Sequence, residues 1–490
     1  MNIDNLDNLT LSEECGVFGI YDKQGLLDLP YETYRALFSL QHRGQESCGI
    51  ALNVDGVLSG HSGMGLVSDV FTANVLNALN GEAKMATGHV RYATSGKRTI
   101  SNAQPMIVHH SKGSMALCHN GNLTNAKTLR NQLELSGSIF HGTSDTEIIT
   151  HLITQNRIVS PNIETAISKT MDVIEGAYCL VVMSATKLIA ARDPYGIRPL
   201  CIGVLPNESG YVVASETCAL DTVGAEFLRD VMPGEIVVID INGIRSLTEK
   251  CKNKKPNICV FEYIYFARPD SIIEGTCVHE ARIEAGKLLA RSHPADADVV
   301  IGAPDSGLDA AQGFAQESGI PYATGIVKNK YVGRSFIQGS QKERANTVRI
   351  KLNPIPSAVS GKRVVLVDDS IVRGTTSKRL IELLYRAGAS EVHFRVSSPP
   401  FRYPCYFGTD VPDKDLLVAT NRNESQIKEL LECDSLGYLS LQDACKLAIN
   451  SDCNFCMGCF DNNYPCEVKD KDYVEPYQRP LSESGTGKTL

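Results

Sequence analysis

The chain has 490 residues, of which 43% are hydrophobic and 21% are charged, and its formal net charge at pH 7 is −8. This length is typical of two to three domains, and this composition is typical of a soluble globular protein. The negative charge argues against generic nucleic-acid binding. The lack of any run of about 18 apolar residues argues against a membrane span.

The first 14 residues, MNIDNLDNLTLSEE, are polar and acidic, without the basic start and apolar core of a secretory signal. We therefore expect a cytoplasmic protein whose 16 cysteines are reduced thiols, nucleophiles or metal ligands and not structural disulfides. A Cys-Gly pair follows this segment at Cys15. We expect residues 1–14 to be a propeptide, so that Cys15 becomes the first residue of the mature chain.

Residues 15–245 contain short strands and helical patterns, with no internal repeat. Strands are predicted at 15–22, 57–67, 85–95, 114–123, 177–185, 187–193, 210–216 and 235–244, and helices near 31–41, 124–135, 145–155 and 163–174. Because the strands and helices mix without strict βα alternation, this part predicts a layered α+β domain.

A polar, lysine-rich stretch at 245–257 leads into a second domain, which we place at residues 246–466. Here buried-strand runs come directly before helical patterns, at 298–303 before 309–319 and at 363–369 before 375–389, and a further strand lies in 391–400. This alternation is typical of an α/β fold with a parallel sheet. The charged residues 467–490 are expected to form a polar tail.

RVVLVDDSIVRGTTSKRL, residues 363–380, carries the most specific local signal. An apolar strand ends in two carboxylates, and a helix then opens with a glycine and three hydroxyl residues. These residues are Asp368, Asp369, Arg373, Gly374, Thr375, Thr376 and Ser377. A helix N-terminus binds phosphate, and adjacent carboxylates hold Mg²⁺ or ribose hydroxyls. The pattern predicts a site for a phosphorylated ribose with a metal ion; a capped helix after a solvated acidic turn is the plainer alternative.

Two further stretches belong with this site. IGAPDSGLDAA, residues 301–311, is a second strand-turn-helix, and Ser306 is its candidate ligand for a pyrophosphate. Residues 331–353 are basic, with cations at Arg334, Lys342, Arg344, Arg349 and Lys351. We expect this basic stretch to be a lid that excludes water and clamps phosphates, and a solvated loop is the alternative.

CNFCMGC places Cys453, Cys456 and Cys459 at a spacing that brings thiolates onto one metal or cluster. A fourth ligand has to come from elsewhere, and Cys259 and Cys405 are the candidates. Because no histidine lies in this C-terminal region, we expect an all-sulfur site. The spacing leaves both zinc and a [4Fe–4S] cluster open.

A cysteine nucleophile needs a base, and an N-terminal residue can use its own α-amino group, whose pKa is ~7.7–8.0. Four motifs follow Cys15 in order: LQHRGQESCGIA (40–51), GHVRYATSG (88–96), CHNGNLTN (118–125) and TSDTEI (143–148). With CGVFGI they resemble the glutaminase domain of N-terminal-nucleophile amidotransferases. That resemblance implies an αββα sandwich.

The same resemblance implies roles for five residues besides Cys15. Arg91 would pair with the α-carboxylate of glutamine, and Asp145 with its α-ammonium group. The side chain of Asn120 and the N–H of Gly121 would form an oxyanion hole, and Arg43 would lie at the bound glutamine.

The stretch 363–380, with its two carboxylates and the helix start that follows them, resembles the phosphoribosyl pyrophosphate motif of type I phosphoribosyltransferases. The two halves together resemble one family, the amidophosphoribosyltransferases, from Cys15 to about residue 466. This implies glutamine hydrolysis at Cys15, internal transfer of ammonia, and formation of 5-phosphoribosylamine from phosphoribosyl pyrophosphate, the first committed step of purine synthesis. It also implies Mg²⁺ near Ser306, Asp368 and Asp369, and phosphoribosyl pyrophosphate contacts from the 368–377 residues named above and from Arg334.

The resemblance is to the branch of the family with a propeptide and a [4Fe–4S] cluster. It implies Cys259, Cys405, Cys456 and Cys459 as the cluster ligands and leaves Cys453 without this role. It further implies a homo-oligomer, as a dimer or tetramer, and feedback inhibition by purine nucleotides.

Three other functions compete with this interpretation. A hexosamine-forming amidotransferase would share the first half, but it would need sugar-isomerase domains where VVLVDDSIVRGTTS stands. A non-catalytic nucleotide sensor would not need Cys15, Arg91, Asn120 and Asp145 together. A zinc-containing form without iron would differ in metal content and in its visible absorption.

Overall fold

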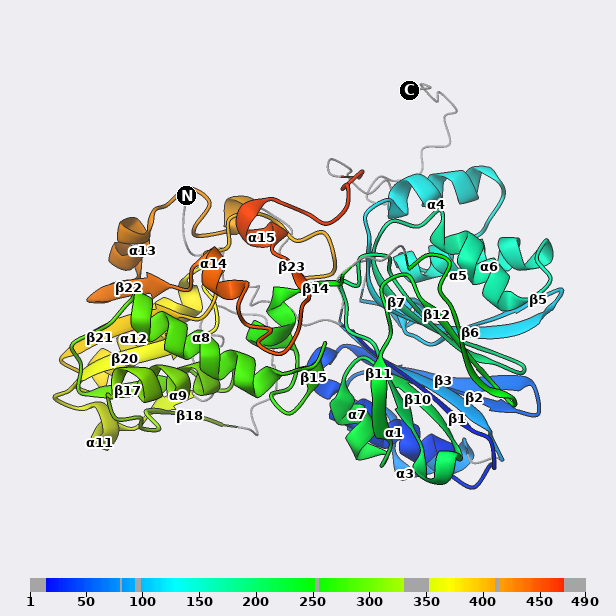
Figure 1. Ribbon diagram of the computed structural model, residues 1–490, viewed down its shortest axis with the longest axis horizontal. Coiled ribbons are helices and arrows are strands. Elements are labelled where there is room, and N and C mark those ends of the chain that lie inside the picture. Colours follow the sequence, from blue (N-terminus) through cyan, green and yellow to red (C-terminus); the bar gives the residue numbers. More distant parts are fainter. Residues whose placement is uncertain are drawn as a thin grey trace.

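The computed structural model describes residues 15–79, 82–92, 98–251, 255–329, 352–409 and 414–470. Two domains lie side by side, one formed by the N-terminal half of the chain and one by the C-terminal half (Figure 1). Within the described ranges, none of the helices has both the length and the apolar character that a membrane crossing requires.

The first domain is built on two antiparallel sheets. One has seven strands in the spatial order β11-β9-β10-β1-β4-β2-β3, and the other has six in the order β13-β12-β8-β7-β6-β5. The seven are β1 (Gly16–Asp22), β2 (Ser47–Val54), β3 (Val57–Met64), β4 (Met85–Arg91), β9 (Cys201–Val204), β10 (Gly210–Ala214) and β11 (Glu226–Asp230). The six are β5 (Met106–His110), β6 (Gly113–Leu123), β7 (Gly176–Ser184), β8 (Leu188–Arg192), β12 (Ile236–Asp240) and β13 (Gly243–Leu247).

Helices cover the outer faces of both sheets. Beside the seven-stranded sheet lie α1 (Leu29–Ser39), α2 (Val67–Val70), α3 (Ala73–Ala78) and α7 (Thr217–Thr222). Beside the six-stranded sheet lie α4 (Ala126–Leu135), α5 (Asp145–Ile158) and α6 (Ile163–Met171). The cap of α1 is local: the Asp28 carboxylate accepts the N–H of Tyr31. The four layers form the αββα sandwich that the motifs imply.

The central core of this domain lies between the two sheets. Val17 and Ala51 of the first sheet pack there with Cys118 and Val181 of the second. The next residue along β1, Phe18, faces the other way and packs with the helices. Because successive side chains of a strand point to opposite faces and both faces are covered, β1 is buried along its whole length.

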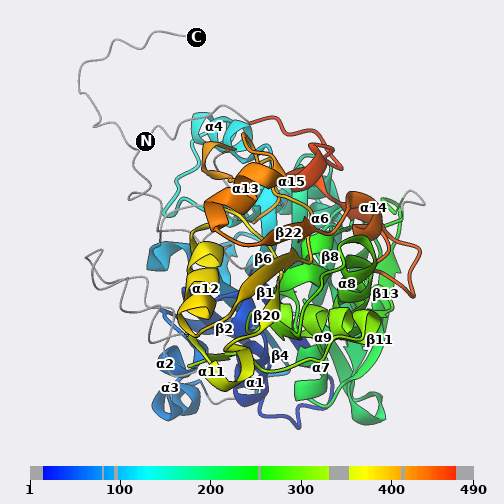
Figure 2. The ribbon, with the colours of Figure 1, turned by 90° about the vertical axis from the view of Figure 1, so that its left-hand side faces the viewer.

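The second domain contains a parallel sheet in the order β17-β20-β21-β22. The strands are β17 (Val299–Gly302), β20 (Arg363–Asp368), β21 (Glu391–Val396) and β22 (Ser435–Tyr438). On one face lie α8 (Val278–Ser292) and α9 (Gly307–Ser318), and on the other lie α11 (Pro356–Val359), α12 (Thr375–Arg386) and α13 (Glu424–Leu431). Figure 2 shows α9 and α12 on opposite sides of β20. This confirms the predicted parallel α/β domain.

Short elements connect the two domains. β14 (Asn257–Cys259) pairs in parallel with β23 (Asn454–Cys456), and the π-helical turn η5 (Glu262–Phe266) follows. The N–H of Cys259 donates to the carbonyl of Ile197 in the first domain, at 3.0 Å. The other short elements are β15 (Ile272–Ile273), β16 (Thr276–Cys277), β18 (Ile326–Lys328), β19 (Leu352–Pro354), α14 (Leu441–Ala444) and α15 (Gly458–Asp461). In the described part of the chain, 3-10 turns lie at Gln41–Arg43, Ile100–Asn102, Pro206–Glu208 and Lys414–Leu416.

Several elements of the structure were not predicted from the sequence, among them β2, β5 and β9 in the first domain and α8 in the second. In α8 the reason is its close packing against α9. A Cβ at Gly286 would lie 1.9 Å from the carbonyl oxygen of Ala310, and one at Gly313 would lie 2.0 Å from that of Ile283. Glycines at the contact weaken the apolar period by which a buried helix is recognised. In addition, β13 continues to Leu247, two residues beyond the boundary predicted at residue 245.

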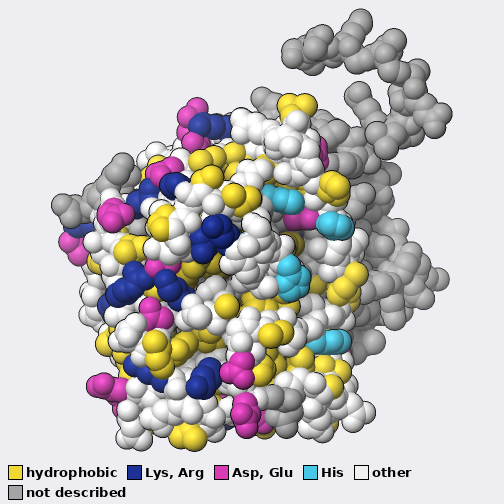
Figure 3. All heavy atoms as spheres, turned by 90° about the vertical axis from the view of Figure 1, so that its right-hand side faces the viewer, with side chains coloured by type: hydrophobic (Ala, Val, Ile, Leu, Met, Phe, Trp, Pro, Cys, Tyr) yellow, Lys and Arg dark blue, Asp and Glu magenta, His cyan; other side chains and the backbone are white. Residues whose placement is uncertain are grey.

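The outer face of the first domain carries a mixed surface. Lys and Arg side chains gather on one side of this face and histidines on the other, with acidic and apolar side chains among them (Figure 3).

Candidate active site

Cys15 comes directly before β1, which lies between β4 and β10 in the seven-stranded sheet. The residue is only 6% exposed, and its Sγ lies 3.5 Å from the carbonyl oxygen of Tyr92, to which it donates. Burial raises the pKa of the Cys15 thiol to about 11, although the charge of Arg91 acts against this shift. The thiol therefore keeps its proton at neutral pH, and a nucleophilic attack needs a base to remove it.

Arg91 and Asp145 both lie close enough to act electrostatically on the Cys15 thiol. Arg91, at the end of β4, forms an ion pair with Glu46. Asp145 begins α5; its carboxylate accepts the N–H of Leu123 at 3.0 Å and lies 3.6 Å from Nδ1 of His119. The structure thus brings together the cation and the carboxylate that were expected to hold the two ends of glutamine.

The candidate oxyanion hole lies on β6. Asn120 is 1% exposed, and neither atom of its side-chain amide has a hydrogen-bond partner among the described residues. Gly121 has a φ of +140°, and a Cβ there would lie 2.1 Å from the carbonyl oxygen of Ala177, so only glycine fits. A buried amide without a partner is costly, and such a group is expected where a ligand supplies the missing bond.

Arg43 lies in a buried cluster of charged side chains close to Cys15. Its side chain is fully buried, and its guanidinium lies 2.9 Å from Glu216 and 2.7 Å from Glu262. Although burial favours the neutral acid, His42 and Arg43 hold the pKa of Glu216 well below its usual range. Arg43 reaches the nucleophile only through the backbone, because its Nε lies 3.4 Å from the carbonyl oxygen of Cys15. The guanidinium thus belongs to a buried ion cluster, and the expected place of Arg43 at the bound glutamine stays a prediction.

Three glutamates at this site, Glu46, Glu216 and Glu262, were not predicted from the sequence. Glu46 lies inside the quoted stretch LQHRGQESCGIA, so the motif contained a signal for it. Glu216 lies in the first domain, 173 residues along the chain from Arg43, whereas Glu262, 219 residues away, becomes a partner of Arg43 only when the two domains come together.

The second candidate site lies at the carboxyl end of β20. Asp368 ends the strand, and Asp369, 8% exposed, accepts hydrogen bonds from the hydroxyls of Ser306 and Ser370. Burial and the charge of Asp369 raise the pKa of Asp368 well above its usual range, and burial also raises that of Asp369. Two carboxylates and a hydroxyl form an oxygen donor set of the kind that suits Mg²⁺.

The loop after this strand leads into α12. Gly374 is the N-cap, with a φ of +87°, and Thr375, Thr376 and Ser377 form the first helical turn. Arg373 is half-buried beside them. Backbone N–H groups at such a helix start are available to a phosphate. Arg334 and the other cations of the expected lid lie outside the described residues, as do the expected propeptide and residues 471–490 of the expected tail.

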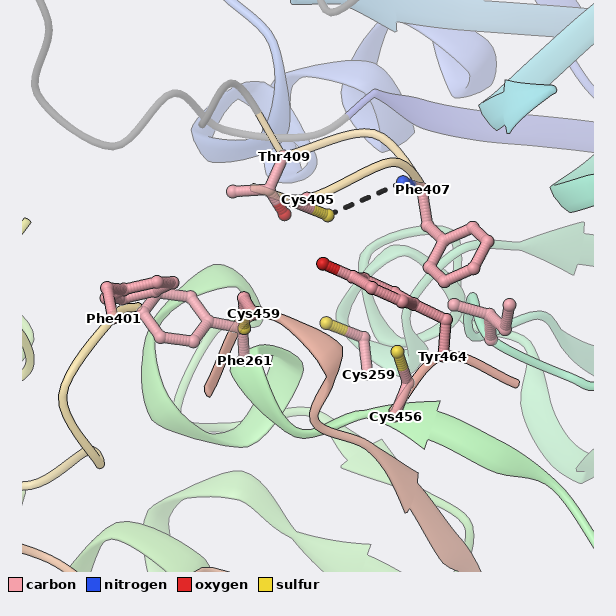
Figure 4. Close-up of a pocket in the computed structure, with 10 residues that line it drawn as sticks. Cys259, Phe261, Phe401, Cys405, Phe407, Thr409, Cys456, Cys459 and Tyr464 are labelled. Carbon is pink, nitrogen blue, oxygen red and sulfur yellow. Dashed lines mark hydrogen bonds between the residues drawn. The ribbon is translucent and has the colours of Figure 1, made fainter. Parts of the chain in front are cut away.

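Four cysteines from three segments line one pocket, which we call the cysteine pocket: Cys259, Cys405, Cys456 and Cys459. Cys259 and Cys456 face each other directly across the β14–β23 pair, and α15 carries Cys459. In Figure 4, Cys405 approaches the pocket from the opposite side, and its sulfur accepts the N–H of Phe407 at 3.4 Å. Cys453 does not line this pocket.

The cysteine pocket is otherwise mostly apolar, with walls from Ile197, Phe261, Phe401, Phe407, Thr409 and Tyr464. Burial raises the pKa of Cys456 to about 12, and burial together with Cys405 and Cys259 raises that of Cys459. Four thiols and no histidine are a donor set that suits zinc or an iron–sulfur cluster. Within the described ranges, however, no group of three or more His, Cys, Asp or Glu side chains is arranged as it stands to hold a metal ion.

Comparisons with known proteins match both halves of the chain. A glutamine amidotransferase domain model matches residues 89–222, and a phosphoribosyl transferase domain model matches residues 279–398. The chain is 46% identical to the amidophosphoribosyltransferase of Bacillus subtilis over 472 residues, which is 95% of this chain and 97% of that one. It is also 46% identical to the amidophosphoribosyltransferase of Archaeoglobus fulgidus over 457 residues, covering 93% and 98% of the two chains.

A solved structure gives the same result. It is the glutamine phosphoribosylpyrophosphate amidotransferase of B. subtilis complexed with ADP and GMP. Its TM-score is 0.86 at 46% identity, with 95% of this chain and 100% of that chain covered. Both domain models match this chain and the relatives share nearly its full length, so the chain belongs to the amidophosphoribosyltransferase family.

Proposed function

We propose that this protein makes 5-phosphoribosylamine, glutamate and pyrophosphate from glutamine, water and phosphoribosyl pyrophosphate, the first committed step of purine synthesis. One observation carries the proposal: a single chain combines the Cys15, Arg91 and Asp145 constellation with the Ser306–Asp369 site on a parallel sheet. A hexosamine-forming amidotransferase would share only the first of these sites.

The glutamine half-reaction takes place at Cys15. Arg91 binds the α-carboxylate of glutamine and Asp145 its α-ammonium group, so that the side-chain amide lies at the thiol. The Cys15 sulfur attacks the amide carbon while the Cys15 α-amine takes the thiol proton. The side chain of Asn120 and the N–H of Gly121 stabilise the oxyanion. Collapse of this intermediate releases ammonia and leaves a γ-glutamyl thioester, which water hydrolyses to glutamate and free Cys15.

This mechanism needs an α-amine at Cys15, which exists only when the bond between Glu14 and Cys15 has been cleaved. We therefore include removal of residues 1–14 in the proposal. The raised pKa of the thiol supports the need for a base so close by.

The second half-reaction takes place beyond the carboxyl end of β20. The phosphate of the substrate lies at the start of α12, against Gly374, Thr375, Thr376 and Ser377, and its ribose hydroxyls lie against Asp368 and Asp369. Arg373 and Arg334 add cations. Mg²⁺ held near Ser306, Asp368 and Asp369 would supply neutralisation of the pyrophosphate leaving group. Ammonia from the first site attacks C1 of the ribose, and pyrophosphate leaves.

For the cysteine pocket we propose a [4Fe–4S] cluster held by Cys259, Cys405, Cys456 and Cys459. The arrangement of four thiols from three segments in an apolar pocket supports this, and zinc is the alternative. Metal analysis and a visible absorption spectrum of anaerobically purified protein distinguish the two. Iron with inorganic sulfide and a broad visible band supports the cluster; one zinc per chain without colour refutes it.

The solved relative was complexed with ADP and GMP. We propose that purine nucleotides bind and inhibit this protein, that it assembles as a homodimer or homotetramer, and that it works in the cytoplasm.

The decisive experiment measures the intact mass and the N-terminal sequence of the purified protein, together with glutamate release with and without phosphoribosyl pyrophosphate. A chain that begins at Cys15, releases glutamate and forms pyrophosphate supports the proposal. Glutamate release by a chain that still carries residues 1–14 refutes the free-amine mechanism. A chain that begins at Cys15 but hydrolyses no glutamine refutes the proposed function.

A further inference from the structure

The walls of the cysteine pocket contact the glutamine site directly. The segment from Cys405 to Thr409 lines the pocket on one side and touches β6 of the first domain on its other side. The side-chain amide of Asn122 donates to the carbonyl of Tyr406 at 2.9 Å. Asn122 is the residue after Gly121 and the second after Asn120, so this bond anchors the strand next to the proposed oxyanion hole.

Backbone packing reinforces this contact. Gly408 has a φ of +119°, and a Cβ on it would lie 3.5 Å from the carbonyl carbon of Gly121. The oxyanion glycine therefore rests against the backbone of the pocket segment. This support matters because, in the described part of the chain, β5 pairs with β6 only between Gly113 and Leu117, whereas β7 pairs with it as far as Leu123.

A second wall of the pocket reaches the nucleophile. Cys259 and Phe261 line the pocket, and Glu262 follows them at the start of η5. The fully buried carboxylate of Glu262 accepts hydrogen bonds from Arg43 at 2.7 to 2.9 Å, and the Nε of Arg43 lies 3.4 Å from the carbonyl oxygen of Cys15.

The two walls are also connected to each other. Arg198 lies 3.6 Å from Glu262 and donates to the carbonyl of Phe407. Arg43, Glu262 and Arg198 all have side chains with no exposed surface. A buried charge pair of this kind resists displacement because separating the partners leaves an uncompensated charge.

We infer that Asn122 and Glu262 are positioning residues of the glutamine half-reaction. Asn122 fixes the strand that carries Asn120 and Gly121, and Glu262 fixes Cys15 through Arg43. The second domain thereby supplies the rear support of the glutaminase site. This inference rests on the proposed function, and it assigns to the walls of the cysteine pocket a role in the geometry of the other reaction.

The test uses the full chain with Asn122→Asp and Asn122→Ala. Aspartate keeps the shape of the side chain but presents an acceptor to the Tyr406 carbonyl, whereas alanine removes the contact. The matched control is Asn156→Ala, because Asn156 is also a half-buried asparagine of this domain, and its side-chain amide donates to Thr170 at 3.0 Å on the helical layer. Each variant is assayed for glutamine hydrolysis and for phosphoribosylamine synthesis from ammonia.

We expect Asn122→Asp and Asn122→Ala to lower kcat of glutamine hydrolysis about 10- to 100-fold, since small displacements of catalytic groups have effects of this size. The KM for glutamine should stay within about twofold, because the oxyanion forms only after binding. Ammonia-dependent synthesis and the rate of Cys15 alkylation by iodoacetamide, which needs no oxyanion hole, should stay within about twofold of wild type. Asn156→Ala should match wild type in every assay.

Glu262→Gln addresses the second wall. It should slow both glutamine hydrolysis and Cys15 alkylation, because the nucleophile itself moves. If this variant does not fold, the Asn122 variants decide the question. Unchanged glutamine hydrolysis in Asn122→Asp, or an equal loss of the ammonia-dependent reaction, overturns the inference. A wild-type protein without glutamine hydrolysis refutes the proposed function instead, and the inference with it.

Discussion

The charged groups of the two candidate sites are arranged in opposite ways. Around Cys15, unlike groups are paired: Arg91 with Glu46, and Asp145 with the N–H of Leu123. At the end of β20, like charges are neighbours, and burial together with Asp369 raises the pKa of Asp368. Within the described residues, the glutamine site pairs its charged groups with one another, whereas the site at β20 places two carboxylates side by side, whose charge a cation bound with the substrate would offset.

This difference predicts that each site can be damaged without the other. Ammonia supplied in the medium bypasses the glutamine site, and glutamine hydrolysis does not require the phosphoribosyl site to turn over. Substitutions therefore separate the two half-reactions.

The largest effect is expected for Cys15→Ala. Glutamine-dependent synthesis should fall at least about 10⁴-fold, because the nucleophile is lost and no other group can form the thioester. Synthesis from ammonia should stay within about twofold. Both rates are measured as pyrophosphate release at saturating phosphoribosyl pyrophosphate.

Cys179→Ala is the control for this substitution. Cys179 is also a fully buried cysteine of the first domain, in the core between the sheets. It should lose stability but keep glutamine hydrolysis per folded molecule. Substantial glutamine-dependent activity in Cys15→Ala would contradict the assignment of the nucleophile.

Asp369→Asn is the corresponding substitution at the second site. Synthesis from glutamine and from ammonia should both fall about 10³-fold, because the oxygen ligands of the cation and of the ribose are weakened. Glutamine hydrolysis should remain. Mg²⁺ with phosphoribosyl pyrophosphate should raise the Tm of wild type and have little effect on that of the variant.

The matched control is Asp298→Asn, at the opposite end of the same sheet, where Asp298 pairs with Arg363 at 2.8 Å. This exposed pair contributes little to stability, and the variant should resemble wild type in both reactions. If Asp369→Asn retained ammonia-dependent synthesis, the phosphoribosyl site would have to lie elsewhere.

Asn120→Leu should lower kcat of glutamine hydrolysis about 10²- to 10³-fold, the usual effect of removing one oxyanion donor. Its stability should nevertheless not fall. Both polar atoms of Asn120 are buried without a partner among the described residues, and an apolar side chain of similar shape removes that cost. Kinetics and thermal unfolding test the two halves of this prediction.

Asn53→Leu is the control, because the buried amide of Asn53, unlike that of Asn120, has hydrogen-bond partners. Asn53 is 3% exposed, but its amide donates to Ser184 at 2.7 Å and accepts from Gly56 at 2.8 Å. This variant should lose about 1–3 kcal/mol of stability and keep its kinetics. Equal destabilisation of both variants would mean that Asn120 is a structural residue.

Elements that depend on a local sequence pattern could be predicted from the sequence, whereas contacts between the two domains could not. The strand before Asp368, the helix from Thr375 and the cap at Gly374 follow from apolar runs and turn residues, and they are observed. The spacing of Cys453, Cys456 and Cys459 predicted a further cysteine from elsewhere in the chain but did not identify it. The β14–β23 pair places Cys259 opposite Cys456, almost 200 residues away in the sequence. Arg43 was assigned by its motif alone. Its partner Glu262 belongs to the other domain, and no periodicity or spacing identifies such a pair.

The smallest expected effect concerns pH and tests which group is the base at Cys15. If the α-amine with a pKa of ~7.7–8.0 accepts the thiol proton, kcat of glutamine hydrolysis rises with pH up to about 8 and then changes less than about twofold between pH 8.5 and 9.5. If the thiol instead had to ionise unaided, its pKa of about 11 would make the rate climb about tenfold over that same interval. In both cases kcat increases with pH, because the amine and the thiol each act in their deprotonated form. Only the plateau above pH 8.5 distinguishes them. A profile that is flat above pH 8.5 supports the amine, and a continued rise would show that the buried thiol ionises without it.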